Sequence, residues 1–214
     1  MKKFRVFVDI SEEEKYLNEM ANKGYFLKKY SSLGRYHFIE SKPEDLHYRV
    51  DYRVFKKKDD FDDYVSLFED AGWMHVYGTY QSGSQYFLPN SSDSTEDIFS
   101  DIESKAGRYL RFIQAARLCS ISFIIALIII LVSVNFNLSE LTFLTPGLWE
   151  KQGSEFWRAF WFEVPFVMLR IIPPIALIIA TILYSIWAIK AKKLYNAVLG
   201  LSLIHISEPT RLRC

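Results

Sequence analysis

The chain has 214 residues, a formal net charge of +1 and 50% hydrophobic residues. This near-neutral total argues against a general nucleic-acid binder, because such proteins need a net basic surface to neutralise phosphates. Charged residues are dense before Arg117 and absent from Leu118 to Val134. The segregation predicts one small soluble domain followed by a membrane part.

The two cysteines, Cys119 and Cys214, have no Cys or His neighbour at metal-ligand spacing. The sequence therefore predicts no metal site, no redox motif and no cofactor. The apolar stretch near the N-terminus of the sequence is too short and too charged for a signal peptide. We therefore expect the N-terminal domain to be cytoplasmic.

The first half of the domain begins with an alternating pattern that predicts a strand at residues 4–8. Ser11, with Glu14 three residues later, predicts a capping box at the start of a helix. Gly24 is typical of the residue that follows a helix end. Two strands are expected next, at residues 25–30 and 35–40.

The same order of elements then restarts. Phe4-Arg5-Val6 aligns with Tyr48-Arg49-Val50, Tyr16 with Tyr64, and Gly24 with Gly72. Residues 1–89 are therefore predicted to form an α+β domain of duplicated strand–helix–strand–strand units, with a mostly antiparallel sheet and two helices. The elements expected in the second half are a strand at 48–55, a helix from about 59 to 72, and strands at 73–80 and 85–88.

A run of Lys56, Lys57 and Lys58 precedes the second predicted helix. These lysines could contact anionic lipid if the domain is tethered to a membrane. The simpler interpretation is a solvated loop followed by acidic residues at a helix N-terminus, where the helix dipole favours them.

The second part of the chain reads as a membrane hairpin. A polar linker and juxtamembrane helix are expected at residues 90–117, with the helix beginning near Asp93 or Ser94 and continuing into the membrane. Two apolar segments are each long enough to cross a bilayer as a helix. The second contains Pro173-Pro174 in its first turns, where proline is tolerated. The predicted segments are spans at 118–138 and 164–190, an aromatic-rich extracytoplasmic loop at 139–163, and a basic end at 191–200.

Basic residues flank both predicted spans, whereas the connecting loop is comparatively acidic. The positive-inside rule then predicts a multi-pass protein of the cell membrane with both flanks in the cytoplasm. The aromatic loop reads either as an interfacial anchor or as a ligand-binding extracellular loop. The residues expected to anchor the chain in the bilayer are Arg108, Arg111, Arg117, Trp149, Trp157, Trp161, Lys190, Lys192 and Lys193.

The tail, residues 201–214, has a different origin in this interpretation. Residues 201–211 resemble the in-frame translation of a transposon-end adapter sequence. We therefore expect the native sequence to differ after about Gly200, and we assign no function to His205 or Cys214. The sequence leaves the native C-terminus undetermined.

The domain also resembles a known family. The blocks Asn18-Glu19-Met20-Ala21 and Glu69-Asp70-Ala71-Gly72-Trp73 are similar to those of an uncharacterised bacterial family, the domain of unknown function DUF2812. The resemblance covers about residues 1–90. Members are commonly followed by membrane helices, and their genes often lie beside those of transcriptional repressors. The resemblance implies a regulatory setting and supplies no catalytic residues.

Enzymatic activity is not predicted. No metalloprotease, nucleophile-elbow or phosphate-binding motif occurs in the sequence. Arg49, Asp51 and Arg53 form the most polar cluster, on one face of a predicted strand. We expect them to make an exposed salt-bridge network, because that arrangement is commoner on strands than a catalytic site.

The leading interpretation is a membrane-anchored regulatory or protein-interaction module, with the lipid bilayer and a cytoplasmic or membrane protein as partners. A first alternative is a small-molecule sensor, because duplicated units of this order also build domains that bind organic compounds between their halves. Its candidate ligand-binding residues are Tyr25, Tyr36, Tyr48, Tyr52, Trp73, Tyr77 and Tyr86. A second alternative is an accessory subunit of a transport system. The sequence predicts no nucleic-acid partner and leaves the oligomeric state open.

Overall fold

The computed structural model describes residues 1–31, 34–90, 97–99 and 101–207. The chain forms two compact units. The domain unit comprises Met1–Gln114 together with the chain from Ile189 onward, and the hairpin unit comprises Ala115–Ala188. The domain unit thus includes residues beyond 89, which the sequence interpretation had assigned to a linker and to the membrane part.

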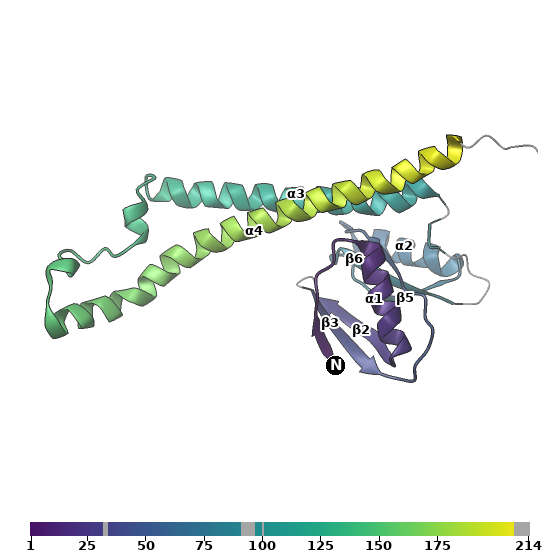
Figure 1. Ribbon diagram of the computed structural model, residues 1–214, viewed down its shortest axis with the longest axis horizontal. Coiled ribbons are helices and arrows are strands. Elements are labelled where there is room, and N and C mark those ends of the chain that lie inside the picture. The colour runs from purple at the N-terminus through teal and green to yellow at the C-terminus, as the bar shows by residue number, and fades with distance from the viewer. Residues whose placement is uncertain (32–33, 91–96, 100, 208–214) are drawn as a thin grey trace, which may run out of the picture. The chain divides into compact units, whose positions relative to one another are not determined.

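The first half of the domain unit contains β1 (Lys2–Phe4), α1 (Ile10–Asn22), β2 (Tyr25–Ser31) and β3 (Arg35–Glu40) (Figure 1). Its strands form an antiparallel sheet of order β1-β3-β2, which we call the first sheet. The two strands expected after the helix are confirmed. The strand expected at residues 4–8 is wrong, because pairing with β3 involves Lys2–Phe4 instead.

The second half contains β4 (Arg49–Tyr52), α2 (Lys58–Asp70), β5 (Trp73–Tyr77) and β6 (Ser84–Pro89). These strands form a second antiparallel sheet, of order β4-β6-β5. The α+β prediction is confirmed. The strands make two three-stranded sheets, rather than one extended sheet, and the edge strands β2 and β5 are neighbours.

The ends of α1 show which local signals decided the fold. Asp9 is the N-cap, and its carboxylate accepts the Ser11 backbone N–H at 3.0 Å. The predicted capping box of Ser11 and Glu14 is therefore wrong, since the earlier Asp side chain satisfies the first turn. Gly24 and Gly72 both have left-handed backbone angles, with φ of +79° and +85°. Both glycines thus follow a helix end as predicted.

The two halves are equivalent in detail beyond the order of their elements. Both sheets carry a register irregularity at the same place, between Leu27 and Lys29 and between His75 and Tyr77. The Arg5 N–H donates to the Gly34 carbonyl at 2.8 Å, and the Arg53 N–H donates to the Gly83 carbonyl at 2.7 Å. The correct correspondence is thus Arg5-Val6-Phe7 with Arg53-Val54-Phe55, and the alignment of Phe4-Arg5-Val6 with Tyr48-Arg49-Val50 is wrong.

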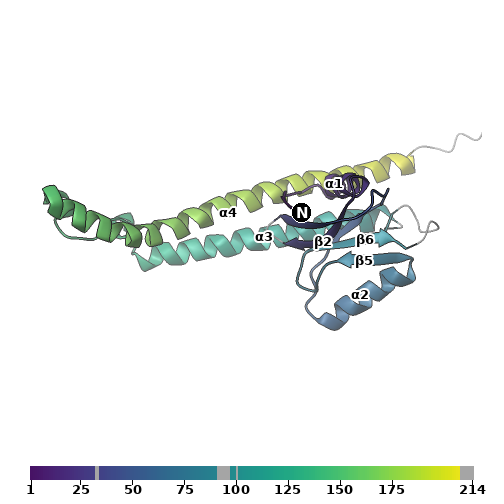
Figure 2. The ribbon, with the colours of Figure 1, turned by 90° about the horizontal axis from the view of Figure 1, so that it is seen from below.

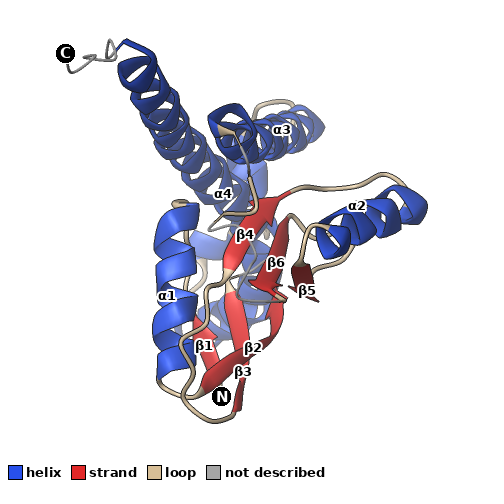
Figure 3. Ribbon diagram, turned by 90° about the vertical axis from the view of Figure 1, so that its right-hand side faces the viewer, coloured by secondary structure: helices blue, strands red, loops and turns tan. Residues whose placement is uncertain are grey.

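The two helices lie on opposite sides of the strands (Figures 2 and 3). The larger core packs around α1. It includes Leu17 of α1, Tyr36 of the first sheet and Tyr86 of the second sheet. The smaller core packs around α2 and includes Tyr64 and Phe87. The second sheet is therefore covered on both faces, and the first sheet is covered on the α1 face.

The first long helix, α3 (Ile102–Ser133), runs unbroken from the domain unit into the hairpin unit. The helix start expected near Asp93 or Ser94 lies outside the described residues. Residues 97–99 are not helical, so the helix begins later than predicted. It ends at Ser133 rather than at residue 138, and two short 3-10 turns follow, Leu138–Leu141 and Leu148–Glu150.

The second long helix, α4 (Gly153–Ser207), begins earlier than predicted. Trp157 and Trp161 therefore lie on a helix, and Pro173-Pro174 lie well inside it rather than in its first turns. Within the hairpin unit, α3 and α4 are in contact, with Ser120 Oγ 3.4 Å from Ser185 Oγ. Residues 201–207 of the predicted tail continue α4, and residues 208–214 lie outside the described residues.

Both α3 and α4 are long and apolar enough to cross a membrane. Only 11% of the residues in the most apolar window of each helix are buried. The core helix of a soluble protein would bury most of such a window, because exposed apolar area costs about 25 cal/mol per Å² in water. Burial, length and composition therefore agree with the membrane part expected from the sequence.

Candidate functional site

The most polar buried region of the domain unit is the place where the first turns of α3 contact α1 and β4. We call it the α3 junction and define it by Arg108, Tyr109 and Arg111 of α3 with Glu14 of α1 and Asp51 of β4. The Arg108 side chain is only 1% exposed. Burying a guanidinium costs free energy unless the group is paired and hydrogen-bonded. The partners of Arg108 are therefore the important contacts of the junction.

Arg108 makes both an ion pair and a hydrogen bond to the backbone. Its Nη1 donates to Glu14 Oε1 at 2.8 Å and to the Val50 carbonyl at 3.0 Å. The Tyr109 hydroxyl donates to Asp9, the N-cap of α1, at 3.2 Å. One turn of α3 is thus bonded to the start of α1 and to the backbone of β4.

Arg111 makes the second ion pair of the junction. Its Nη2 donates to Asp51 Oδ1 at 2.5 Å and its Nε donates to the Tyr52 carbonyl at 2.7 Å. Asp51, with 1% of its side chain exposed, also accepts the Tyr64 hydroxyl of α2 at 2.9 Å. Charged hydrogen bonds of this kind are about twice as strong as neutral ones.

These contacts correct the predicted network of Arg49, Asp51 and Arg53. Asp51 is buried rather than exposed, and its cationic partner comes from α3. The Arg53 guanidinium instead lies over the rings of Phe55 and Tyr64, at 5.7 and 5.4 Å from their centroids. The pairing depends on tertiary contacts, because α3 is far away in the sequence.

The outer edge of β4 is covered by Asn18 and by residues of the α3 junction. The Tyr48 N–H donates to Asn18 Oδ1 at 2.7 Å, and the Val50 N–H donates to Glu14 Oε1 at 3.0 Å. The carbonyls of Val50 and Tyr52 accept from the two arginines of the junction. An edge strand normally exposes such groups and invites pairing with another strand. Here α1 and α3 satisfy them with side chains.

Three consecutive glutamates of α1 contact different parts of the domain unit. The Glu12 carboxylate lies 3.9 Å from Lys190 Nζ of α4, and Glu14 belongs to the α3 junction. Glu13 accepts the hydroxyls of Tyr36 at 2.6 Å and Tyr86 at 2.7 Å, one from each sheet. Burial raises the pKa of the Glu13 carboxyl, although these two hydrogen bonds oppose the shift.

Most of the aromatic residues predicted to bind a ligand belong to the larger core or pack beside it. Tyr36, Tyr48 and Tyr86 are buried in the larger core, and Trp73 is buried in the smaller core. Tyr25, Tyr52 and Tyr77 are half-buried beside the larger core. The structure thus brings most of them together as packing around α1.

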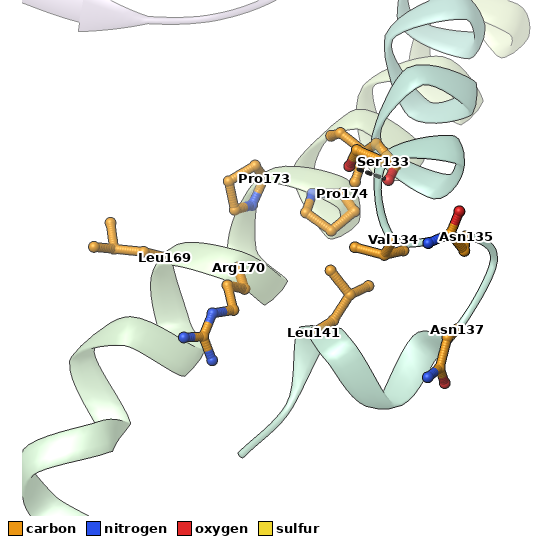
Figure 4. A pocket seen from close by; sticks show the side chains of 10 residues that line it. Ser133, Val134, Asn135, Asn137, Leu141, Leu169, Arg170, Pro173 and Pro174 are labelled. Carbon is orange, nitrogen blue, oxygen red and sulfur yellow. Dashed lines mark hydrogen bonds between the residues drawn. The ribbon is translucent and has the colours of Figure 1, made fainter. Parts of the chain in front are cut away.

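Two of the surface cavities among the described residues lie beside other side chains, and none of these aromatic residues lines either one. One, of about 460 Å³, lies beside α2 and is lined by Arg53, Phe55 and Leu67 among others. The other, of about 570 Å³, lies in the hairpin unit near Ser133, Leu141, Arg170 and Pro174 (Figure 4). Arg170 there donates to the Thr142 carbonyl at 3.0 Å.

The residues predicted to anchor the chain divide into two groups. Arg108 is buried, and both Arg108 and Arg111 are engaged in ion pairs of the domain unit, which differs from the expected contact with lipid headgroups. The other residues predicted to anchor the chain are exposed. They are Arg117, Trp149, Trp157, Trp161, Lys190, Lys192 and Lys193.

Sequence reasoning missed the α3 junction for a physical reason. The positive-inside rule counts basic residues near a span and takes no account of their partners. A weak signal was present, since Arg108 and Arg111 are three residues apart and so share one face of a helix. Among the described residues, no group of three or more His, Cys, Asp and Glu side chains is placed to hold a metal ion.

No curated protein and no solved structure matches the chain significantly. A family model described as a protein of unknown function, DUF2812, matches residues 9–124. This match is longer than the resemblance seen in the sequence and includes the α3 junction and the start of the apolar part of α3. Because the match covers more than half of the 214 residues, the chain belongs to the DUF2812 family.

Proposed function

We propose that this protein is a membrane-anchored regulatory or protein-interaction module, without enzymatic activity, whose domain is coupled to its first membrane helix. The observation that carries the proposal is the burial of Arg108 at the α3 junction. The helix that holds this residue continues unbroken into an apolar segment long enough to cross a bilayer. A change in the domain would therefore act directly on the base of that helix.

The coupling follows from the rigidity of a helix. A flexible Gly/Ser-rich linker would decouple a domain from its anchor, whereas a continuous helix acts as a stiff connection. Displacing α3 from the domain would break the ion pairs of Arg108 and Arg111 and expose polar edge groups of β4. Two states separated by such contacts are what a switching element needs.

We further propose that the domain unit faces the cytoplasm. Exposed Arg117 precedes the apolar part of α3, and the exposed lysines Lys190, Lys192 and Lys193 follow the apolar part of α4. Their positive charge favours the cytoplasmic side for both flanks. Single-cysteine labelling in the loop at residues 145–153 tests this orientation, and labelling from the cytoplasmic side alone would reverse it.

The proposed regulatory role is tested by quantitative crosslinking in native membranes. We compare the wild-type chain with an Arg108→Gln variant, which breaks the buried pair, and with Lys105→Gln, which breaks a partly exposed pair on the same helix. We expect a reproducible set of partners for the wild type and for Lys105→Gln, and its loss for Arg108→Gln. Recovery of the wild-type chain alone would contradict the proposal.

The recurrence of strand order, register irregularity and hydrogen bonding supports an internal duplication of the domain. We propose that one copy kept its helix free at the surface while the other became the attachment point of α3. The duplication would thus have supplied a stable scaffold on which one helix could take the coupling role.

A further inference from the structure

One face of the first sheet is largely exposed among the residues that the structure describes. Alternation along β3 points Tyr36 and Phe38 into the larger core and Arg35, His37 and Ile39 to the opposite side. The side chains of β1 follow the same pattern, because Lys2 pairs with His37 and Phe4 with Arg35. We call this surface the open face.

Positive charge dominates the open face. Lys2, His37 and Lys29 form one row across the three strands, and Arg35 lies in the next row. Lys2, Lys29 and Arg35 make no ion pair within the part of the chain that the structure describes. The register places no Asp or Glu of β1, β2 or β3 on this side, since Glu40 alternates to the other face.

The positive charge of the open face affects the pKa of His37, which lies among these cations. Partial desolvation, and then the positive charges of Lys2, Lys29, Arg35 and the N-terminal ammonium, lower the pKa of His37. A positive surface of this kind attracts anions and repels a second copy of itself. The open face therefore fits an anionic partner better than a dimer of this chain.

Apolar side chains stand among the cations. Phe4 is 70% exposed and Ile39 is 46% exposed. The positions equivalent to Lys2, His37 and Ile39 in the second sheet are Val50, Tyr86 and Leu88, which are buried in the larger core. The same face of the fold is thus a buried apolar surface in one half and an exposed basic, partly apolar surface in the other.

We propose that the open face docks on the surface of a membrane that contains anionic lipid. Basic side chains are attracted to anionic headgroups, and exposed apolar side chains between them can enter the headgroup region. The near-neutral charge of the whole chain argues against nucleic acid as the partner. This proposal rests on the proposed function, because the membrane helices keep the domain within reach of a bilayer.

The test uses the full chain in lipid nanodiscs and measures hydrogen exchange of β1 and β3 amides. One set of discs contains phosphatidylcholine alone, and the other contains phosphatidylcholine with phosphatidylglycerol. Each basic side chain at an anionic surface contributes about a fivefold preference for the docked state. We therefore expect exchange about tenfold or more slower in the anionic discs, and a return to the neutral-disc rate at about 1 M salt.

The variant carries Lys2→Glu, Lys29→Glu and Arg35→Glu. The matched control carries Lys56→Glu, Lys57→Glu and Lys58→Glu in the exposed basic run at the start of α2. We expect the open-face variant to lose the slowing and the control to keep it. Equal exchange of the wild type in both kinds of disc would overturn the proposal, as would unchanged slowing in the open-face variant.

Two further readouts separate this proposal from its alternatives. Slowing caused by an added oligonucleotide in phosphatidylcholine discs, with none caused by phosphatidylglycerol, would overturn the docking proposal in favour of nucleic acid. Failure of the chain to remain in any disc would instead contradict the proposed membrane anchoring. A chain that stays in the discs and shows no lipid-dependent exchange refutes only the docking.

Discussion

The two sheets of the domain unit have the same strand order, and yet their central strands meet different surroundings. In β6 every residue from Gln85 to Leu88 is buried, because α1 covers one face of the second sheet and α2 the other. In β3 buried and exposed residues alternate, because only α1 covers the first sheet. Equivalent local structure therefore does not imply equivalent burial.

The helices differ in the same way. Both α1 and α2 have 13 residues and an acidic first turn. Five residues of α1 are buried, whereas Tyr64 is the buried residue of α2 among the side chains described. The difference in burial arises because α1 packs against both sheets and also contacts α3 at the α3 junction. Two units with the same order of elements are thus packed asymmetrically.

The largest expected effect comes from the α3 junction. Arg108→Met leaves Glu14 without its buried cation, and breaking such a pair by removing one partner costs about 3–5 kcal/mol. Denaturant unfolding of the detergent-solubilised chain, followed by circular dichroism, measures the loss. Lys105→Met removes a partly exposed pair and is expected to cost about 1 kcal/mol or less. Similar losses in the two variants would show that burial of Arg108 is unimportant.

The next effect tests the two sheets at equivalent positions. Leu88 is 7% exposed, so Leu88→Ala removes buried contacts and is expected to cost about 2–5 kcal/mol. Its equivalent Ile39 lies on the open face, where Ile39→Ala is expected to change stability by about 0.5 kcal/mol or less. The same unfolding measurement applies to both. A large loss for Ile39→Ala would mean that another element covers the open face.

A smaller difference in stability is expected between substitutions at two equivalent tyrosines, Tyr64 and Tyr16. The Tyr64 hydroxyl donates to the buried Asp51 carboxylate, so Tyr64→Phe is expected to cost about 1.5–3 kcal/mol. The equivalent Tyr16 presents its ring to the Arg5 guanidinium, a contact that phenylalanine also provides. Tyr16→Phe should therefore be close to neutral. The reverse order of the two costs would contradict the assigned role of Asp51.

The smallest effect concerns pH. The pKa of Glu13 is raised above its ordinary value of 4.5, so the folded state holds this proton more tightly than the unfolded state. The contribution to stability is therefore greatest below pH 4.5 and is lost as the pH rises through the raised value. A Glu13→Gln variant should lack this decline in unfolding free energy. An identical pH slope in both proteins would show that Glu13 does not titrate in this way.

Several features were predictable because they depend on short segments. The glycines at the helix ends, the two strands after α1 and the apolar runs of α3 and α4 all follow from local patterns. The family resemblance depended on short blocks such as Glu69-Asp70-Ala71-Gly72-Trp73. The boundaries of β1 and β4 were less predictable, because only pairing with β3 and β6 decides which residues of an extended segment form a strand.

By itself, the sequence determined the class of the fold, the repeated order of its elements, and two helices long and apolar enough to cross a membrane. Hydrophobic periodicity and chain length suffice for these features, because they act over one helix or strand at a time. The tertiary structure alone decided that Arg108 and Asp51 are buried partners at the α3 junction and that one sheet keeps an open basic face. Such features depend on which surfaces the packing of distant segments covers, and a local pattern does not record that choice.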